Sequence, residues 1–272
     1  MDRRTPERSI TMNYSIDKDT QLDLKFKDKD ALTIELSPNS SGTLTMNVEG
    51  SGAITIDINA QAHSHWKVLW INHSDGALDI IENVNVDEHA DVRLIYGELS
   101  TGKHTKDTKV HLIGDHANVE LIAAVLAFDE LQWSMQADHK ARNTEANLNT
   151  NAIILDNGKL RLDVEGKIAK GFIRSKTHQM SRILNLGKDT QGIVFPKLLI
   201  DENDVEASHA ASVGQANDEH IFYLQSRGLT KLEALRLMIK GYLAPVIKEI
   251  DQIEIQEKLM EEIDKKVNDY VR

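Results

Sequence analysis

Much of the chain alternates between apolar and polar residues with a period of two. From about Ala31 this alternation recurs in short runs, at residues 32–36, 44–48, 54–58, 66–70, 92–96, 131–133 and 160–164. Successive side chains of a β-strand point to opposite faces, so each run has one face suited to burial and one suited to solvent. Clusters of Gly, Asn, Asp, Ser and Pro separate the runs, for example at residues 38–42 and 156–158. The pattern therefore predicts many short strands joined by tight turns.

Three architectures accommodate many short strands at even spacing: a sandwich, a barrel and a β-helix. Roughly 180 residues of strand is long for one sandwich, whereas the stacked coils of a β-helix absorb such length easily. No strict sequence repeat is visible, so periodicity alone leaves the three open. Residues 116–136 fit a strand and a helix equally well.

The pattern changes near Asn217, where helical signals begin. Residues 218–225 read as a short helix, and Thr230 with Glu233 forms a capping box, in which each side chain satisfies a free backbone amide. The helix that follows is expected to kink or end at Pro245. Beyond it, apolar residues recur every fourth position and predict a long final helix with one buried stripe; they are Ile255, Leu259, Ile263, Val267 and Val271.

These patterns divide the chain into three parts. Residues 1–30 are highly charged and weakly patterned, so we expect a loosely docked N-terminal arm. Residues 31–215 form an all-β core, and residues 216–272 form a C-terminal helical domain. The fold class is therefore mainly β with a helical tail.

Composition and charge narrow the function. The chain has 272 residues, a net charge of −11 and no cysteine. The negative charge argues against nucleic-acid binding and against docking on anionic membranes, since both need clustered Lys and Arg. Without cysteine there is no disulfide, no thiolate chemistry and no cysteine-held cluster within the chain. No apolar run approaches membrane-spanning length and no secretory signal is apparent, so the cytoplasm is the expected compartment.

The segment Gly97-Glu-Leu-Ser-Thr-Gly-Lys103 is close to a phosphate-binding P-loop. A P-loop needs Ser or Thr after its lysine, to hold magnesium, and a helix that begins at the phosphates. Here His104 follows, and residues 105–113 alternate like a strand. We therefore interpret the segment as a β-turn between strands.

Two further clusters carry possible chemistry. His63 and His65, with His73 nearby, are a conceivable metal site, although scattered surface histidines are common in β proteins. Asp201, Glu202, Asp204 and Glu206 crowd one segment. Paired carboxylates catalyse glycoside hydrolysis, so a stand-alone carbohydrate-active β-helix enzyme is an alternative function. Aromatic residues make up only 5% of the chain, and the preferred interpretation is a solvated loop and strand.

Several blocks in the second half of the chain occur together in one order. They are Pro-Lys-Leu-Leu-Ile at 196–200, Asp-Val-Glu-Ala-Ser-His-Ala-Ala-Ser-Val-Gly at 204–214, and Ile-Phe-Tyr-Leu-Gln-Ser-Arg-Gly at 221–228. In this order they resemble the core of the SufB/SufD family of iron–sulfur cluster assembly proteins. The resemblance is clear from about His139 to Leu243.

The resemblance implies a right-handed parallel β-helix followed by a helical domain. It also implies a non-catalytic scaffold that pairs with a SufB/SufD-type chain and docks a SufC-type ABC ATPase through the helical domain. The matching dock residues are Arg227, Gly228, Thr230 and Glu233. An ATPase on a separate chain would also account for the incomplete P-loop.

In the family pattern His209 occupies a Ser-His-Gly position, which makes it the candidate for cluster ligation or for the pairing interface, with Glu206 as an acidic neighbour. The chain departs from the pattern at Ala207, Ala210 and Ser212, and Met180 stands where SufB-type chains carry a cysteine. The site is therefore SufD-like. We expect no cofactor in the isolated chain and a transient iron–sulfur cluster in the complex. A compact scaffold that pairs with its own copy, without a separate SufB, is the other possibility.

Overall fold

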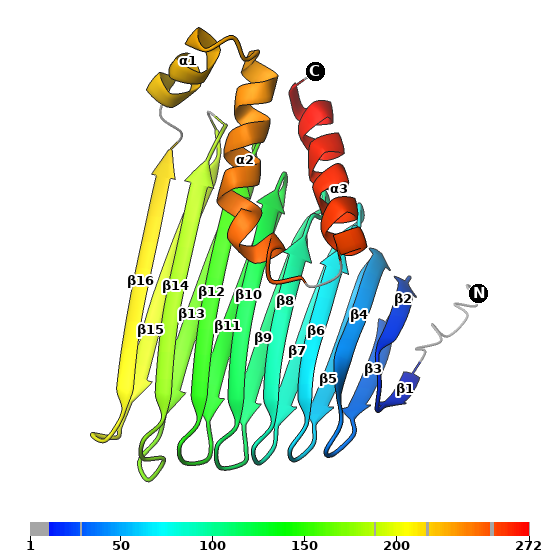
Figure 1. The fold of residues 1–272 in the computed structure, drawn as a ribbon, viewed down its shortest axis with the longest axis vertical. Coiled ribbons are helices and arrows are strands. Elements are labelled where there is room, and N and C mark those ends of the chain that lie inside the picture. The colour runs from blue at the N-terminus through cyan, green and yellow to red at the C-terminus, as the bar shows by residue number, and fades with distance from the viewer. Residues whose placement is uncertain (1–10, 28, 188, 216–217, 251–252, 272) are drawn as a thin grey trace, which may run out of the picture.

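The β-region is a solenoid of two facing parallel sheets (Figure 1). The computed structural model describes residues 11–27, 29–187, 189–215, 218–250 and 253–271. The odd-numbered strands form one sheet of eight: β1 (Thr11–Ile16), β3 (Lys29–Leu36), β5 (Gly52–Ala60), β7 (Leu78–Val86), β9 (His104–Leu112), β11 (Glu130–His139), β13 (Lys159–Ile168) and β15 (Gln191–Ile200). The even-numbered strands form the other: β2 (Thr20–Phe26), β4 (Ser41–Gly50), β6 (His65–Asn72), β8 (Asp91–Glu98), β10 (Asn118–Ala127), β12 (Glu145–Ile154), β14 (Lys176–Asn185) and β16 (Glu206–Gln215). A parallel β-solenoid is thus the correct choice among the three architectures.

The coils differ in length, which explains why no sequence repeat is visible. Lys29 pairs with Ala53, 24 residues later, whereas Lys159 pairs with Gln191, 32 residues later. Turns absorb the difference, while the strand alternation stays in register from coil to coil. The stacking therefore depends on a two-residue pattern and not on a repeated motif.

Two apolar cores hold the molecule together. The first fills the solenoid and consists of the inward-facing residues of both sheets, such as Ile54, Ile56 and Ile58 of β5. The second lies outside, between the even-numbered sheet and two helices. Those helices are α2 (Lys231–Ile247) and α3 (Ile253–Val271), and α1 (Asp218–Ser226) precedes them. Figure 1 shows α2 and α3 side by side over the ends of the even-numbered strands.

The helical signals are largely confirmed. Thr230 accepts a hydrogen bond from the Glu233 amide at 3.2 Å, and the Thr230 amide donates to the Glu233 carboxylate at 2.7 Å. On α3, Leu259, Ile263 and Val267 are buried against the sheet. Pro245 was expected to kink or end the helix, and α2 ends at Ile247, two residues beyond it. So close to the helix end, Pro245 removes only one of the last hydrogen bonds.

The N-terminal arm is wrong for the residues that the structure describes. Residues 1–10 lie outside them, but Thr11–Ile16 and Thr20–Phe26 are the strands of the first coil. Leu24 and Phe26 are buried, while Asp23 and Lys25, which alternate with them, point outward. The charged residues at the outward positions made this regular strand look unpatterned in the sequence. The ambiguous residues 116–136 are likewise strand, forming β10 and most of β11.

No helix in the described part of the chain is long and apolar enough to cross a bilayer.

Candidate functional site

The last coil of the solenoid is open to solvent. All ten residues of β16 are exposed, and within the described chain β16 has a ladder partner on one side only, β14. The facing strand β15 is half exposed, with a ladder to β13 alone. No further strand follows in the described residues, because the chain turns into α1. Both sheets therefore end at the same place, with free backbone N–H and C=O groups along their edges.

His209 lies on the inward side of this open end. It pairs in register with Gln179 of β14, a side chain that is only 4% exposed and packs inside the solenoid. Paired residues of neighbouring strands share a face, so His209 points toward the solenoid axis although no coil of the described residues covers it. The imidazole is thereby accessible to a chain that docks against the open end.

Glu206 does not join His209. The two are three residues apart in one strand, which places them on opposite faces. Glu206 forms an ion pair with Lys176 at 2.8 Å on the outer face, and the hydrogen bond from Lys176 lowers the pKa of the Glu206 carboxyl. Met180 also faces outward, with 41% of its surface exposed. His209 is therefore the member of this candidate set that the strand directs toward the solenoid axis.

The inward face beneath β16 is polar, which the sequence interpretation missed. Thr177, Gln179, Ser181 and Asn185 of β14 point inward and are buried. Within the described residues, Thr177 Oγ1, Gln179 Oε1 and Asn185 Oδ1 have no hydrogen-bond partner. The signal in the sequence was the run Thr-His-Gln-Met-Ser at 177–181, whereas β5 carries Ile54, Ile56 and Ile58 at its inward positions.

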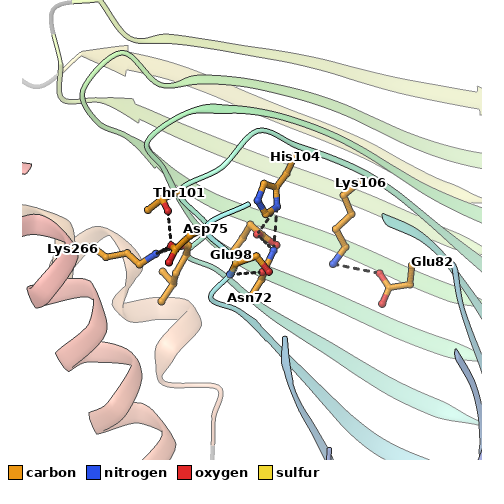
Figure 2. Close-up of polar contacts among 10 residues, drawn as sticks. Asn72, Asp75, Glu82, Glu98, Thr101, His104, Lys106 and Lys266 are labelled. Carbon is orange, nitrogen blue, oxygen red and sulfur yellow. Dashed lines mark hydrogen bonds and ion pairs between the residues drawn. The ribbon is translucent and has the colours of Figure 1, made fainter. Parts of the chain in front are cut away.

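A second polar cluster lies deep inside the middle coils (Figure 2). The Lys106 ammonium is 3.6 Å from a carboxylate oxygen of Glu82 and sits over three aromatic rings; its distances to the ring centroids of Tyr96, Trp70 and Trp133 are 4.0, 4.4 and 4.8 Å. Burial lowers the pKa of Lys106. Aromatic faces and Glu82 replace the water that this ammonium has lost.

Glu98 continues the cluster toward the solenoid corner. Asn72 Nδ2 donates to its carboxylate, and His104 Nδ1 lies 3.9 Å from it. Burial raises the pKa of the Glu98 carboxyl. Beyond the corner, Figure 2 shows Lys266 of α3 reaching toward Asp75, at 3.9 Å. Glu82, Glu98, His104 and Lys106 are each at most 3% exposed, and we interpret the cluster as holding the core in one arrangement.

The near-P-loop is a turn between strands, as expected. β8 ends at Glu98 and β9 begins at His104, so no helix follows Lys103. Lys103 forms an ion pair with Glu130 at 2.9 Å on the surface. Thr101 donates a hydrogen bond to Asp75 at 2.6 Å, and this bond also stabilises the turn. The segment has neither the helix nor the free lysine that phosphate binding requires.

The histidines of the conceivable metal site are kept apart. His63 occupies a left-handed turn and stacks on His89, 5.2 Å between ring centroids, and His89 stacks on His116 at 4.7 Å. His65 opens β6, whereas His73 follows its other end and contacts Glu262 of α3. No group of three potential ligands with metal-binding geometry occurs among the described residues.

The acidic segment serves the loop between β15 and β16. Glu202 accepts hydrogen bonds from the amides of Gly171 at 2.9 Å and Asn203 at 2.8 Å, and these lower the pKa of its carboxyl. Asp204 contributes its carbonyl to the Arg174 amide at 2.6 Å. This bonding agrees with the interpretation of a structural loop.

The expected dock residues lie at the α1–α2 junction. Gly228 adopts a φ of +97°, which side chains rarely tolerate and which ends α1. The guanidinium of Arg227 stacks on the Tyr223 ring at 5.3 Å. Beside them Phe222 is 72% exposed and Tyr223 is 56% exposed. An apolar surface rimmed by Arg227 is typical of a protein contact.

Comparison with known proteins agrees with this geometry. Residues 27–242 match the family model described as SUF system FeS cluster assembly, SufBD core domain. The iron–sulfur cluster assembly protein SufD of Bacillus subtilis is 33% identical over 173 residues, covering 63% of this chain and 40% of that protein. A SufBD family protein of Pyrococcus horikoshii is 27% identical over 154 residues, covering 56% of this chain and 34% of the relative.

A SufBD family protein of Mycobacterium tuberculosis is 25% identical over 173 residues, which is 20% of its own length. The matched part is thus less than half of each of these relatives. The family model, however, spans most of the solenoid and reaches into α2. The chain belongs to the SufBD family of iron–sulfur cluster assembly proteins.

Proposed function

We propose that the chain is a non-catalytic scaffold subunit of an iron–sulfur cluster assembly complex. In this proposal the open end pairs with a SufB/SufD-type chain, and the α1–α2 junction docks a SufC-type ABC ATPase. The observation that carries the proposal is the uncovered last coil, with two sheet edges and an inward-facing His209. The right-handed winding expected of the family and a cytosolic location belong to the same proposal.

Pairing through the open end is proposed because the last coil leaves inward side chains and backbone hydrogen-bonding groups exposed to solvent. β16 exposes its inward side chains, and Val213 is 47% exposed where its register partner Ile183 is buried. A second solenoid end placed against it would bury these residues and pair the free strand edges. The partner is either a separate SufB-type chain or a second copy of this chain.

His209 is then at the junction of two chains. Imidazole nitrogen is a competent ligand for iron, and it replaces thiolate in some iron–sulfur clusters. Since this chain has no cysteine, we assign His209 as its donor to a transient cluster, with the remaining ligands supplied by the partner. Glu206 is the weaker candidate, because it faces outward and is bound to Lys176.

The ATPase dock is proposed from the surface around Arg227. Phe222 and Tyr223 project from α1, and Gly228 and the capped start of α2 set the angle between the helices. Such a helix pair presents its side chains to a groove on a partner. ATP hydrolysis belongs to that partner in this proposal, since the turn at 97–103 is not a P-loop.

The test is co-expression with candidate ATPase and SufB-type chains, followed by mass measurement of the intact complex. Val213→Asp is expected to abolish pairing with the SufB-type chain while the ATPase still binds. The double variant Phe222→Asp with Arg227→Ala is expected to abolish ATPase binding while pairing is retained. Ile81→Asp is a matched control, because Ile81 is 49% exposed but lies on β7, away from both surfaces. Loss of both partners in every variant, or of neither, would contradict the two-surface proposal.

A further inference from the structure

We propose that Gln179 is a positioning residue for His209: its side-chain oxygen accepts a hydrogen bond from the imidazole once a partner covers the open end. This inference rests on the proposed pairing, and it concerns a residue outside the candidate set drawn from the sequence. It assigns a role to the buried, unpartnered oxygen beneath β16.

The orientation of the Gln179 amide is determined by one bond. Its Nε2 donates to the Lys197 carbonyl of β15 at 3.0 Å, so the oxygen must be the other terminal atom. That oxygen, Oε1, is buried and has no partner among the described residues. An unsatisfied buried acceptor is costly, so a donor that reaches it gains its full hydrogen-bond energy.

The surroundings leave one direction for such a donor. On β12, the register partner of Gln179 is Leu148, which has no polar group. On the opposite sheet stands Gly166, where even an added Cβ would lie 3.1 Å from Gln179 Nε2. Thr177 and Ser181 share the face of Gln179, but each is two residues away, about 6.6 Å along the strand.

The remaining neighbour is His209. It is the register partner of Gln179 on β16 and shares its face, one interstrand spacing of about 4.8 Å away. A neutral imidazole has one N–H donor and one lone pair. Donation from the N–H to Gln179 Oε1 would hold the ring in a single tautomer and aim the other nitrogen at the gap between the chains. Ligating histidines are commonly oriented by such an acceptor.

The experiment reads the His209 ring directly. The full chain is labelled with ¹⁵N in its histidine rings, and the His209 signals are assigned by their loss in His209→Ala. Ring nitrogen shifts are recorded at a pH where the imidazole is neutral, in the complex with the pairing chain. Wild type should show one dominant tautomer, and Gln179→Met, which keeps the volume but not the acceptor, should show a mixture.

Two further variants separate positioning from packing. Gln179→Glu keeps an acceptor oxygen and should retain the single tautomer. Thr177→Val is the matched control. Thr177 is also an inward residue of β14 whose side-chain oxygen has no hydrogen-bond partner among the described residues, but its register partner on β16 is Ala207 and not His209. This variant should leave the His209 spectrum unchanged. In cluster assembly, Gln179→Met should lower cluster or iron affinity about 10- to 100-fold while the complex remains intact.

The failures are distinguishable. If wild type and Gln179→Met give the same tautomer mixture, the positioning role is overturned, whatever the cluster does. If His209→Ala assembles and forms clusters normally, the proposed ligand role fails while the tautomer result stands. If no chain pairs with the open end, the pairing proposal fails, and the positioning role that rests on it is overturned with it.

Discussion

The coil that contains β5 and the last coil share one backbone plan but differ in what their inward faces hold. On β5, Ile54, Ile56 and Ile58 point inward and are sealed by the coils on either side. On β16, the inward positions hold small or polar residues and Val213, and all are exposed. An inward side chain is buried only when a coil lies beyond it. The comparison supports the proposal that the last coil receives a neighbour from outside the described residues.

The largest expected effect tests this difference directly. Ile58→Asp places an unpaired carboxylate in the sealed interior and should cost more than about 4 kcal/mol of unfolding free energy, enough to prevent folding. Val213→Asp in the last coil should change the stability of the isolated chain by less than about 0.5 kcal/mol. Urea unfolding followed by circular dichroism measures both. Similar losses would mean that the open end is already part of the folding core.

The interior ion pair gives the next effect. Lys106→Met leaves the Glu82 carboxylate buried without its cation, and the expected loss is about 3–5 kcal/mol. The double variant Lys106→Met with Glu82→Gln should recover part of that loss, because the Glu82 charge is removed together with its cation. Lys176→Met removes the cation of the exposed Glu206 pair and should have no measurable effect. Unfolding midpoints of the four proteins check the comparison, and a double variant no better than the single one would contradict it.

The buried His139 should make the stability of the fold sensitive to acid. His139 is buried in β11, and burial lowers its pKa to about 4 from 6.5. In the unfolded chain the ring binds a proton below pH 6.5, whereas in the folded protein it does so only near 4. Stability should therefore fall by about 3 kcal/mol as pH drops through this window.

A control variant isolates that contribution. His139→Gln should flatten the part of the stability profile between these pH values, although it also loses the contact between Nδ1 and Thr144 Oγ1 at 2.7 Å. Unfolding free energies measured across this pH range decide the matter, and an unchanged slope in His139→Gln would assign the acid response to other groups.

The smallest effect concerns the helical tail. Thr230→Ala removes the N-cap of α2 and should cost about 1 kcal/mol, confined to the start of that helix. Hydrogen exchange should accelerate at the first turn of α2 and stay unchanged in the strands. Exchange that rises equally in β10 and β12, against which α2 packs, would show that tail and solenoid unfold as one unit.

The strand pattern was readable wherever inward residues were apolar and outward residues were polar, as at Ile54–Ile58. It failed at residues 20–26 and 177–181, for opposite reasons. At 20–26, the outward charges of Asp23 and Lys25 obscured the row of inward apolar residues. At 177–181 the inward row itself is polar, so Gln179 was not recognised as a residue of the interior. Alternation in the sequence identifies the inward and outward faces of a strand only when the two faces differ in polarity.

By itself, the sequence determined the strand alternation, the capped helices, the turn at the near-P-loop and the family blocks around His209, because all of these depend on neighbours within a few residues. The tertiary structure decided which sheet each strand joins and which coil stays uncovered. It also decided that His209 lies over Gln179 while Glu206 faces away. These relations join residues about 30 positions apart through coils of unequal length, and only the stacking of the coils determines that register.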